Sequence, residues 1–247
     1  MADKCSLRVV IIDDSATVRL TLRRILTDAG FNVVAAARDG LEGLHAVRTH
    51  RPDVVTLDIN MPNMDGLQAL RQILAEQWVP VVMCSTLTRR GAEITMECLA
   101  AGAVDFIHKP ESAEGWDHVA KILPIKLRVA AKAKPRRSVE GAGRRVVLPA
   151  GVPARAPLLV LIAASTGGPA AIEAVLRELP EDFPVPVLVT QHMPAGFTAS
   201  FAERLDRVCG IHCVEAQDGQ AAVAGTAYVA PGGYHLRIGH DFTLHLD

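Results

Sequence analysis

Two groups of polar residues in this chain have types and positions that could support chemistry. In the first, Asp13, Asp14, Asp58, Ser85 and Lys109 each stand at the end of a short apolar run. Three carboxylates at one edge would repel one another, and their oxygen atoms suit Mg²⁺ as a shared cation. Lys109 and Ser85 could bind a phosphoryl group while Asp58 attacks its phosphorus, so we expect phosphoryl transfer to this carboxylate.

The second group lies in the stretch LIAASTGGPAAIEA, residues 161–174, where Ser165 precedes two glycines and Pro169. Glycines allow close backbone approach, and proline suits the first turn of a helix. Backbone N–H groups at such a helix start could bind a phosphate or an oxyanion. The stretch matches neither G-x-G-x-x-G, nor the P-loop, nor G-x-S-x-G. A plain strand-to-helix turn is the simplest alternative.

His192 favours acyl chemistry for this second group. It follows the next apolar run, so parallel neighbouring strands would place it at the same sheet edge as Ser165, within reach as a general base. A surface or capping histidine is the competing interpretation of this residue.

The elements that must position the first group form five repeats of strand and helix. Apolar runs rich in Val and Ile occupy residues 7–13, 31–37, 53–59, 79–85 and 104–109, and segments with helical periodicity occupy 16–29, 40–50, 64–77, 89–101 and 112–129. Five such units predict a parallel sheet covered on both faces. Ligands of such sheets gather at the carboxyl ends of the strands, which is where these polar residues fall.

The pattern of strands and helices resumes after a basic segment. Residues 126–156 hold nine Lys and Arg against one Glu and are rich in Ala, Pro and Gly, which is typical of a flexible linker. We therefore predict a first domain at 1–125, a linker at 126–156 and a second α/β domain at 157–247. In the second domain we expect a buried strand at 158–164, a helix at 169–179, a strand at 185–190, a helix at 197–205 and short strands or hairpins to the end.

Composition argues against several classes of protein. The net charge is −1 and the linker lacks interleaved aromatic residues, so nucleic-acid binding is not expected. Five cysteines in 247 residues do not suggest a disulfide framework. Cys209, His212 and Cys213 offer three soft ligands but no fourth, so a strand and its turn is the better interpretation than zinc. The start lacks a signal-peptide pattern and no apolar run could span a membrane, so we expect a cytoplasmic protein.

Residues 5–125 resemble a response-regulator receiver domain. The resemblance rests on the aspartate pair, on LDINMPNMDG at 57–66, and on the serine and lysine that end the later runs. It implies phosphorylation by a chemotaxis histidine kinase with Mg²⁺ as cofactor. The roles that it implies are phospho-acceptor for Asp58, Mg²⁺ ligand for Asp13, Asp14, Asp58 and the Asn60 carbonyl, and switch or phosphate-sensing residue for Ser85, Phe106 and Lys109.

Residues 157–247 resemble the catalytic domain of the chemotaxis protein-glutamate methylesterases. The motifs are ASTGGP, QHMPAGFTASFAERL and YVAPGGYHL. The resemblance implies Ser165 as nucleophile, His192 as general base and Thr166 as an active-site neighbour, without a cofactor. It also implies methyl-accepting chemoreceptors as substrates, deamidation of specific glutamines, and an unphosphorylated receiver that blocks the esterase site.

One motif of that family is missing. The aspartate that orients the family's histidine lies in a GMGxDG segment, which does not occur before Asp247, and neither Asp218 nor Asp241 lies in a matching motif. We therefore expect a truncated, incomplete catalytic domain with an unpaired sheet edge and an uncovered apolar face. The leading function is a phosphorylation-activated methylesterase; the alternative is an inactive esterase that acts only as a phospho-accepting receiver module.

Overall fold

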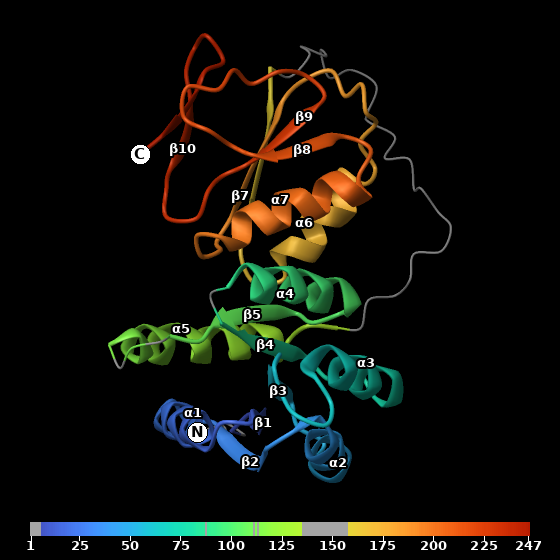
Figure 1. Cartoon of the computed structure of the whole chain (residues 1–247), viewed down its shortest axis with the longest axis vertical. Coiled ribbons are helices and arrows are strands. Elements are labelled where there is room, and N and C mark those ends of the chain that lie inside the picture. The colour runs from blue at the N-terminus through green and yellow to red at the C-terminus, as the bar shows by residue number, and fades with distance from the viewer. Residues whose placement is uncertain (1–5, 87, 111, 113, 135–157) are drawn as a thin grey trace, which may run out of the picture.

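The first part of the chain, called the receiver part after the domain that it resembles, is an alternating strand-and-helix fold, as the repeats predicted. The computed structural model describes residues 6–86, 88–110, 112, 114–134 and 158–247. Figure 1 shows the receiver elements below and the second part above. In chain order the receiver elements are β1 Arg8–Ile12, α1 Ala16–Asp28, β2 Asn32–Ala37, α2 Gly40–His50, β3 Val54–Asp58, α3 Gly66–Glu76, β4 Val81–Ser85, α4 Arg89–Ala101, β5 Asp105–His108 and α5 Gly115–Ala130.

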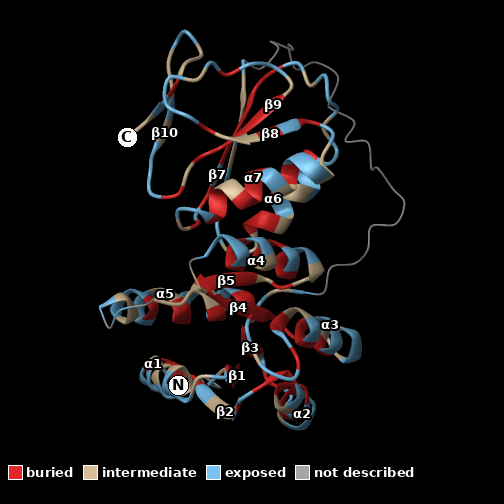
Figure 2. Ribbon diagram, viewed as in Figure 1, coloured by how far each residue is buried: buried red, intermediate tan, exposed pale blue. Residues whose placement is uncertain are grey.

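The five receiver strands form one parallel sheet in the order β2-β1-β3-β4-β5. Alternate side chains of a strand point to opposite faces, so Val9 and Ile11 of β1 pack with α1 and α5, whereas Val10 and Ile12 pack with α2, α3 and α4. Both faces are therefore apolar, and β1, β3, β4 and β5 are buried along most of their length, whereas the edge strand β2 is mostly half-buried (Figure 2). This double cover leaves the strand ends as the place for polar chemistry.

The second part is built on another parallel sheet. Its elements are β6 Val160–Ala164, α6 Gly168–Leu176, β7 Val187–Gln191, α7 Phe197–Val208, β8 His212–Glu215, β9 Thr226–Val229, β10 Leu236–Ile238 and β11 Leu244–Leu246. The sheet order is β6-β7-β9-β8, with all pairs parallel, and β10 and β11 form an antiparallel hairpin. The predicted α/β class, parallel neighbours and short strands near the end are confirmed.

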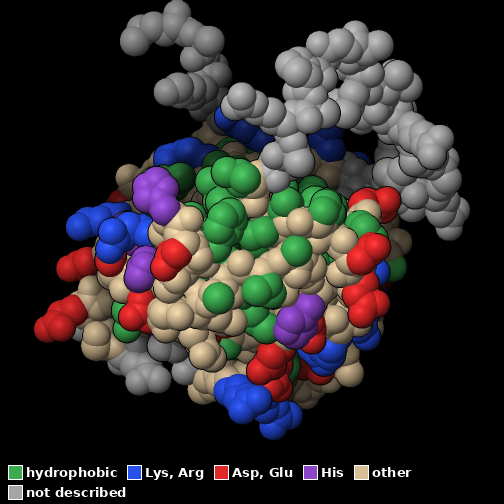
Figure 3. All heavy atoms as spheres, turned by 90° about the horizontal axis from the view of Figure 1, so that it is seen from above, with side chains coloured by type: hydrophobic (Ala, Val, Ile, Leu, Met, Phe, Trp, Pro, Cys, Tyr) green, Lys and Arg blue, Asp and Glu red, His purple; other side chains and the backbone are tan. Residues whose placement is uncertain are grey.

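One expectation about this sheet is wrong. We predicted a buried strand at 158–164, but Leu158 and Leu161 are 74% and 69% exposed. The reason is position: in the described part of the chain, β6 is an edge strand that pairs only with β7, and its outward-facing side chains meet no covering element. Seen from above relative to Figure 1, the surface carries a gathering of apolar side chains (Figure 3).

The two parts meet where α4 packs against α6 and α7 (Figure 1). Met96 and Leu99 of α4 approach Pro169 of α6 and Phe201 of α7, and the cavity between them holds only about 10 Å³. Phe106 of β5 stacks on Phe197 at the start of α7, with ring centroids 4.7 Å apart. Helix α4 and strand β5 of the receiver are thus joined to the helix that follows the His192 loop.

Helix α5 continues past the domain boundary that we predicted at residue 125. It reaches Ala130 because Leu127 and Ala130 are buried against the receiver sheet. The rest of the predicted linker, from residue 135 onward, lies outside the described residues. None of the helices in the described part is long and apolar enough to cross a membrane.

Candidate functional site

The first predicted group comes together at the carboxyl ends of β1, β3, β4 and β5. Carboxylate oxygens of Asp13, Asp14 and Asp58 lie within 4.8 Å of one another. Lys109 places its Nζ atom 2.6 Å from Asp13 Oδ2 and 2.8 Å from Asp58 Oδ1. One ammonium thus pairs with two of the three carboxylates, Asp13 and Asp58, and both of these are buried.

Burial and charge determine the ionisation of Asp58. Burial raises the pKa of Asp58 to about 6; the Lys109 ammonium opposes this rise, and the Asp13 carboxylate adds to it. The site therefore holds excess negative charge that a divalent cation would neutralise. Receiver domains generally use Mg²⁺ for phosphorylation, and this set of oxygen donors fits that ion. Asn60 lies two residues after Asp58, and its role as a ligand stays a prediction.

Ser85 lies at the end of β4, but its hydroxyl contacts residues of α4 and not Asp58. Ser85 Oγ is 2.9 Å from Thr95 Oγ1 and 3.3 Å from the Gly91 carbonyl, both in α4. Thr95 is fully buried and also donates to the Gly91 carbonyl at 2.6 Å. Sequence reasoning missed Thr95, whose only signal is a polar residue on the buried face of a helix.

Phe106 connects the receiver site to the second part. Its ring is 3% exposed, stacked on Phe197 at an interplanar angle of 20°, and 5.8 Å from Lys126 Nζ. Lys126 also pairs with Asp105 at 2.7 Å, which fixes the ammonium beside the ring. Sequence reasoning singled out Phe106 but not its partner Phe197, since nothing in the spacing of the two residues indicates the contact.

Ser165 and His192 lie side by side at the carboxyl ends of β6 and β7. Ala164 and Gln191 are partners in the parallel register, and each is followed directly by one of the two residues. The backbone N–H of His192 donates to the Ala164 carbonyl at 3.2 Å, which extends the strand pairing to the histidine. Both residues are exposed at the sheet edge. The prediction that they stand at adjacent strand ends is confirmed.

The turn after Ser165 also has the predicted form. Gly167 has φ +77°, a left-handed conformation that favours glycine, and Pro169 occupies the first turn of α6. The Ser165 carbonyl accepts hydrogen bonds from Gly168 N at 2.7 Å and from Gln191 Nε2 at 3.0 Å. Thr166 lies between the serine and this helix start.

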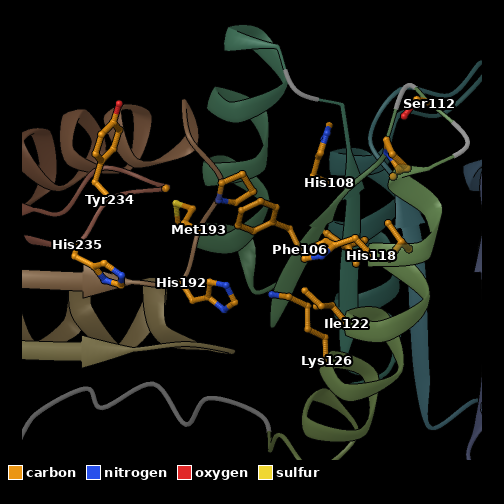
Figure 4. Close-up of a pocket in the computed structure, with 16 residues that line it drawn as sticks. Phe106, His108, Ser112, His118, Ile122, Lys126, His192, Met193, Tyr234 and His235 are labelled. Atoms are coloured by element: carbon orange, nitrogen blue, oxygen red, sulfur yellow. The ribbon is translucent and has the colours of Figure 1, made fainter. Parts of the chain in front are cut away.

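His192 faces a cleft of about 900 Å³ between the two parts. Figure 4 shows its imidazole directed toward the receiver side, where Lys126 and Ile122 of α5 lie. Met193, Tyr234 and His235 line the opposite side. The receiver therefore stands directly across the cleft from His192.

Neither aspartate considered as a partner for His192 reaches it. Asp218 accepts a hydrogen bond from Leu246 N, and Asp241 accepts from the backbone and hydroxyl of Thr243. Among the described residues, no carboxylate forms an ion pair or hydrogen bond with His192.

Comparison with known proteins identifies the family. The family model described as CheB methylesterase matches residues 160–247, and that of the response regulator receiver domain matches residues 9–119. A protein-glutamate methylesterase/protein-glutamine glutaminase from Oleidesulfovibrio alaskensis is 45% identical over 94% of this chain and 71% of its own length. One from Archaeoglobus fulgidus is 44% identical over 94% of this chain and 68% of its own. The chain belongs to this methylesterase family.

A solved structure covers the first part. The response regulator domain of Thermotoga maritima CheB is 41% identical, with a TM-score of 0.49, and the match covers 53% of this chain and 99% of that domain. The two family models and the curated relatives confirm, at the level of the family, the resemblance on which the sequence interpretation relied. The roles of individual residues stay predictions.

The buried carboxylate Asp58 gives a prediction for stability. Asp58→Asn is expected to raise the melting temperature of metal-free protein by several degrees at pH 7.5. The pKa of Asp58, raised to about 6 in the folded protein, lies above its ordinary value of 3.8. An acid with a raised folded pKa destabilises the fold increasingly as pH rises from 4 through 6, so the gain should nearly vanish at pH 4.

Thermal unfolding in a chelator at pH 4 and pH 7.5 measures this effect. Asp65→Asn is the matched control, because Asp65 is exposed and asparagine also caps a helix N-terminus. A lower melting temperature for Asp58→Asn at pH 7.5, or an equal gain at both pH values, would contradict the assignment.

Proposed function

We propose that this chain hydrolyses γ-methyl esters of glutamate side chains on chemoreceptors, and deamidates specific glutamines, under the control of phosphorylation at Asp58. The observation that carries the proposal is the parallel register that puts Ser165 and His192 next to each other at one sheet edge. The names of the relatives support the substrate class, and the match to the receiver family supports regulation by phosphorylation.

Hydrolysis follows from the two side chains and the helix start. His192 takes the proton of the Ser165 hydroxyl as Oγ attacks the ester carbonyl carbon. Backbone N–H groups at the start of α6 bind the oxyanion of the tetrahedral intermediate, helped by the positive end of the helix dipole. The bond to the methoxy oxygen then breaks, and His192 donates the proton, which releases methanol.

Water completes the cycle. His192 removes a proton from water, the hydroxide attacks the acyl carbon, and the bond to Ser165 Oγ breaks as the serine regains its proton. Glutamate is the product. With glutamine as substrate the same steps release ammonia instead of methanol.

Phosphorylation takes place at the carboxyl ends of the strands in the receiver sheet. A carboxylate oxygen of Asp58 attacks the phosphorus of a histidine kinase's phosphohistidine, whose N–P bond breaks. Asp13, Asp14, Asp58 and the Asn60 carbonyl would hold Mg²⁺, which when bound neutralises charge on the transferred phosphoryl group. Lys109 pairs with a phosphoryl oxygen.

The contacts of Ser85 and Phe106 suggest how the signal is passed on. A phosphoryl group on Asp58 offers the Ser85 hydroxyl a charged acceptor, which draws it away from Thr95 and Gly91 of α4. Helix α4 and Phe106 both pack against α7, so their movement loosens the contact that keeps the receiver across the cleft from His192. We place this protein in the cytoplasm, with the kinase and the receptors' signalling domains.

Ser165→Ala is expected to lower methanol release from methylated chemoreceptor by about 10⁴-fold or more, because the nucleophile is lost. Ser112→Ala is the control, since Ser112 lines the same cleft from the receiver side. Wild-type rates in Ser165→Ala would exclude Ser165 as nucleophile.

The alternative function is a phospho-accepting receiver module without esterase activity. It is motivated by the lack of a carboxylate partner for His192 among the described residues. Phosphoryl uptake by the wild-type chain without any methanol release would favour this alternative.

Asp58→Asn is expected to abolish phosphoryl uptake, because an amide oxygen is too weak a nucleophile to replace a carboxylate. Radiolabelled phosphoryl transfer from a histidine kinase in the presence of Mg²⁺ measures uptake. Asp65→Asn should be labelled as well as the wild type. Label retained on Asp58→Asn would reject Asp58 as the acceptor.

A further inference from the structure

A buried glutamine connects the backbones of the two residues at the proposed esterase site. Gln191 is the last residue of β7, pairs with Ala164 and is 6% exposed. Side chains alternate along a strand, so Gln191 shares the helix-covered face of the sheet with Val187 and Val189. An amide on that apolar face has few possible partners.

The nitrogen of this amide donates to both neighbouring backbones. Gln191 Nε2 is 3.0 Å from the Ser165 carbonyl oxygen and 3.3 Å from the His192 carbonyl oxygen. Carbonyl oxygens only accept hydrogen bonds, so the nitrogen and not the oxygen of the amide must face them. One side chain thus holds the main chain at the proposed nucleophile and at the proposed base.

The amide oxygen fits against the start of α6. Gln191 Oε1 is buried and has no hydrogen-bond partner in the described structure. A Cβ atom on Gly168 would lie 1.9 Å from this oxygen, so a side chain at residue 168 would displace the amide from its present position. An unbonded buried oxygen costs stability, and methionine would fill the space without that cost. The contribution of the amide therefore lies in the two hydrogen bonds that it donates.

The bonds to the Ser165 carbonyl determine the orientation of the next N–H group. This carbonyl is held by both Gly168 N and Gln191 Nε2. The peptide is planar and trans, so the N–H of Thr166 points in the opposite direction, away from the buried amide. In the described structure no backbone carbonyl accepts a hydrogen bond from Thr166 N, which leaves it available to a ligand beside Ser165.

We propose that Gln191 is a positioning residue for the hydrolysis. By holding the Ser165 carbonyl inward, it turns the Thr166 N–H toward the oxyanion, and through the His192 carbonyl it fixes the backbone of the base relative to the serine. Preorganised N–H donors are among the largest contributors to acyl transfer, and a small misorientation is costly. This inference rests on the proposed roles of Ser165 and His192.

The test uses the full chain and a fluorophosphonate probe, which reacts with activated serines, with adducts located by mass spectrometry. Gln191→Met is expected to slow labelling of Ser165 by about 10²-fold, with a melting temperature close to that of the wild type. Gln217→Met is the matched control, because Gln217 is exposed in the same part of the chain. Labelling of Gln191→Met at the wild-type rate would overturn the inference.

Gln191→Glu separates positioning from packing and serves if Gln191→Met does not fold. A glutamic acid side chain of the same shape can donate a hydrogen bond only when it is protonated. Its labelling rate relative to the wild type should therefore recover as pH is lowered from 8 to 5. A ratio that does not change with pH would contradict the positioning role.

An NMR measurement keeps this inference separate from the proposed function. A wild-type chain that is not labelled at Ser165 would contradict the role of the serine and not, by itself, that of the glutamine. In that case the Thr166 amide resonance decides: a change in Gln191→Met but not in Gln217→Met supports the inference, and an unchanged resonance overturns it.

Discussion

Parallel strand pairing is the constraint on which both sites depend. Backbones that run in one direction bring all carboxyl ends of the strands to one edge, while covering helices bury the rest of each strand. In the receiver sheet this gathers Asp13, Asp58, Ser85 and Lys109 from four strands. In the second sheet the same rule places Ser165 beside His192. Residues distant in sequence become a charge cluster in one sheet and the proposed nucleophile with its proposed base in the other.

The chemistry proposed for the two sites differs, and the sites are joined by packing between the two parts and not by shared residues. The polar contacts of Ser85 end in α4, and α4 packs against α7. Phe106 adds an aromatic contact to Phe197, the first residue of the helix that follows the His192 loop. A continuous set of contacts therefore connects Asp58 with the loop of His192. Through these contacts a charge added at Asp58 could change the access of a substrate to His192. Packed helices have discrete arrangements, which suits a contact that is either formed or broken.

The strands, helices and strand-end residues could be predicted because hydrophobic periodicity and chain direction are local properties. The position of Ser165 and His192 at adjacent strand ends followed from the expectation of parallel neighbours, and the register of Ala164 with Gln191 confirms it. Thr95, Phe197 and Gln191 were not predicted, because their roles arise from contacts across the fold that no spacing encodes. In the sequence Gln191 is one residue of the QHMPAGF stretch, and only the fold places its amide between two backbone carbonyls. Leu161 was misjudged, since an apolar strand at a sheet edge has the same pattern as one in the centre.

The central claim is that phosphorylation of Asp58 controls access to the proposed esterase site. Amide hydrogen exchange before and after phosphorylation tests this claim most directly. The account predicts faster exchange in α7, residues 197–208, and in α4, residues 89–101, once Asp58 carries a phosphoryl group, with little change in α1 and α2. Phosphorylation that leaves exchange in α7 unchanged would contradict the claim that the contact between α4, Phe106 and α7 carries the signal.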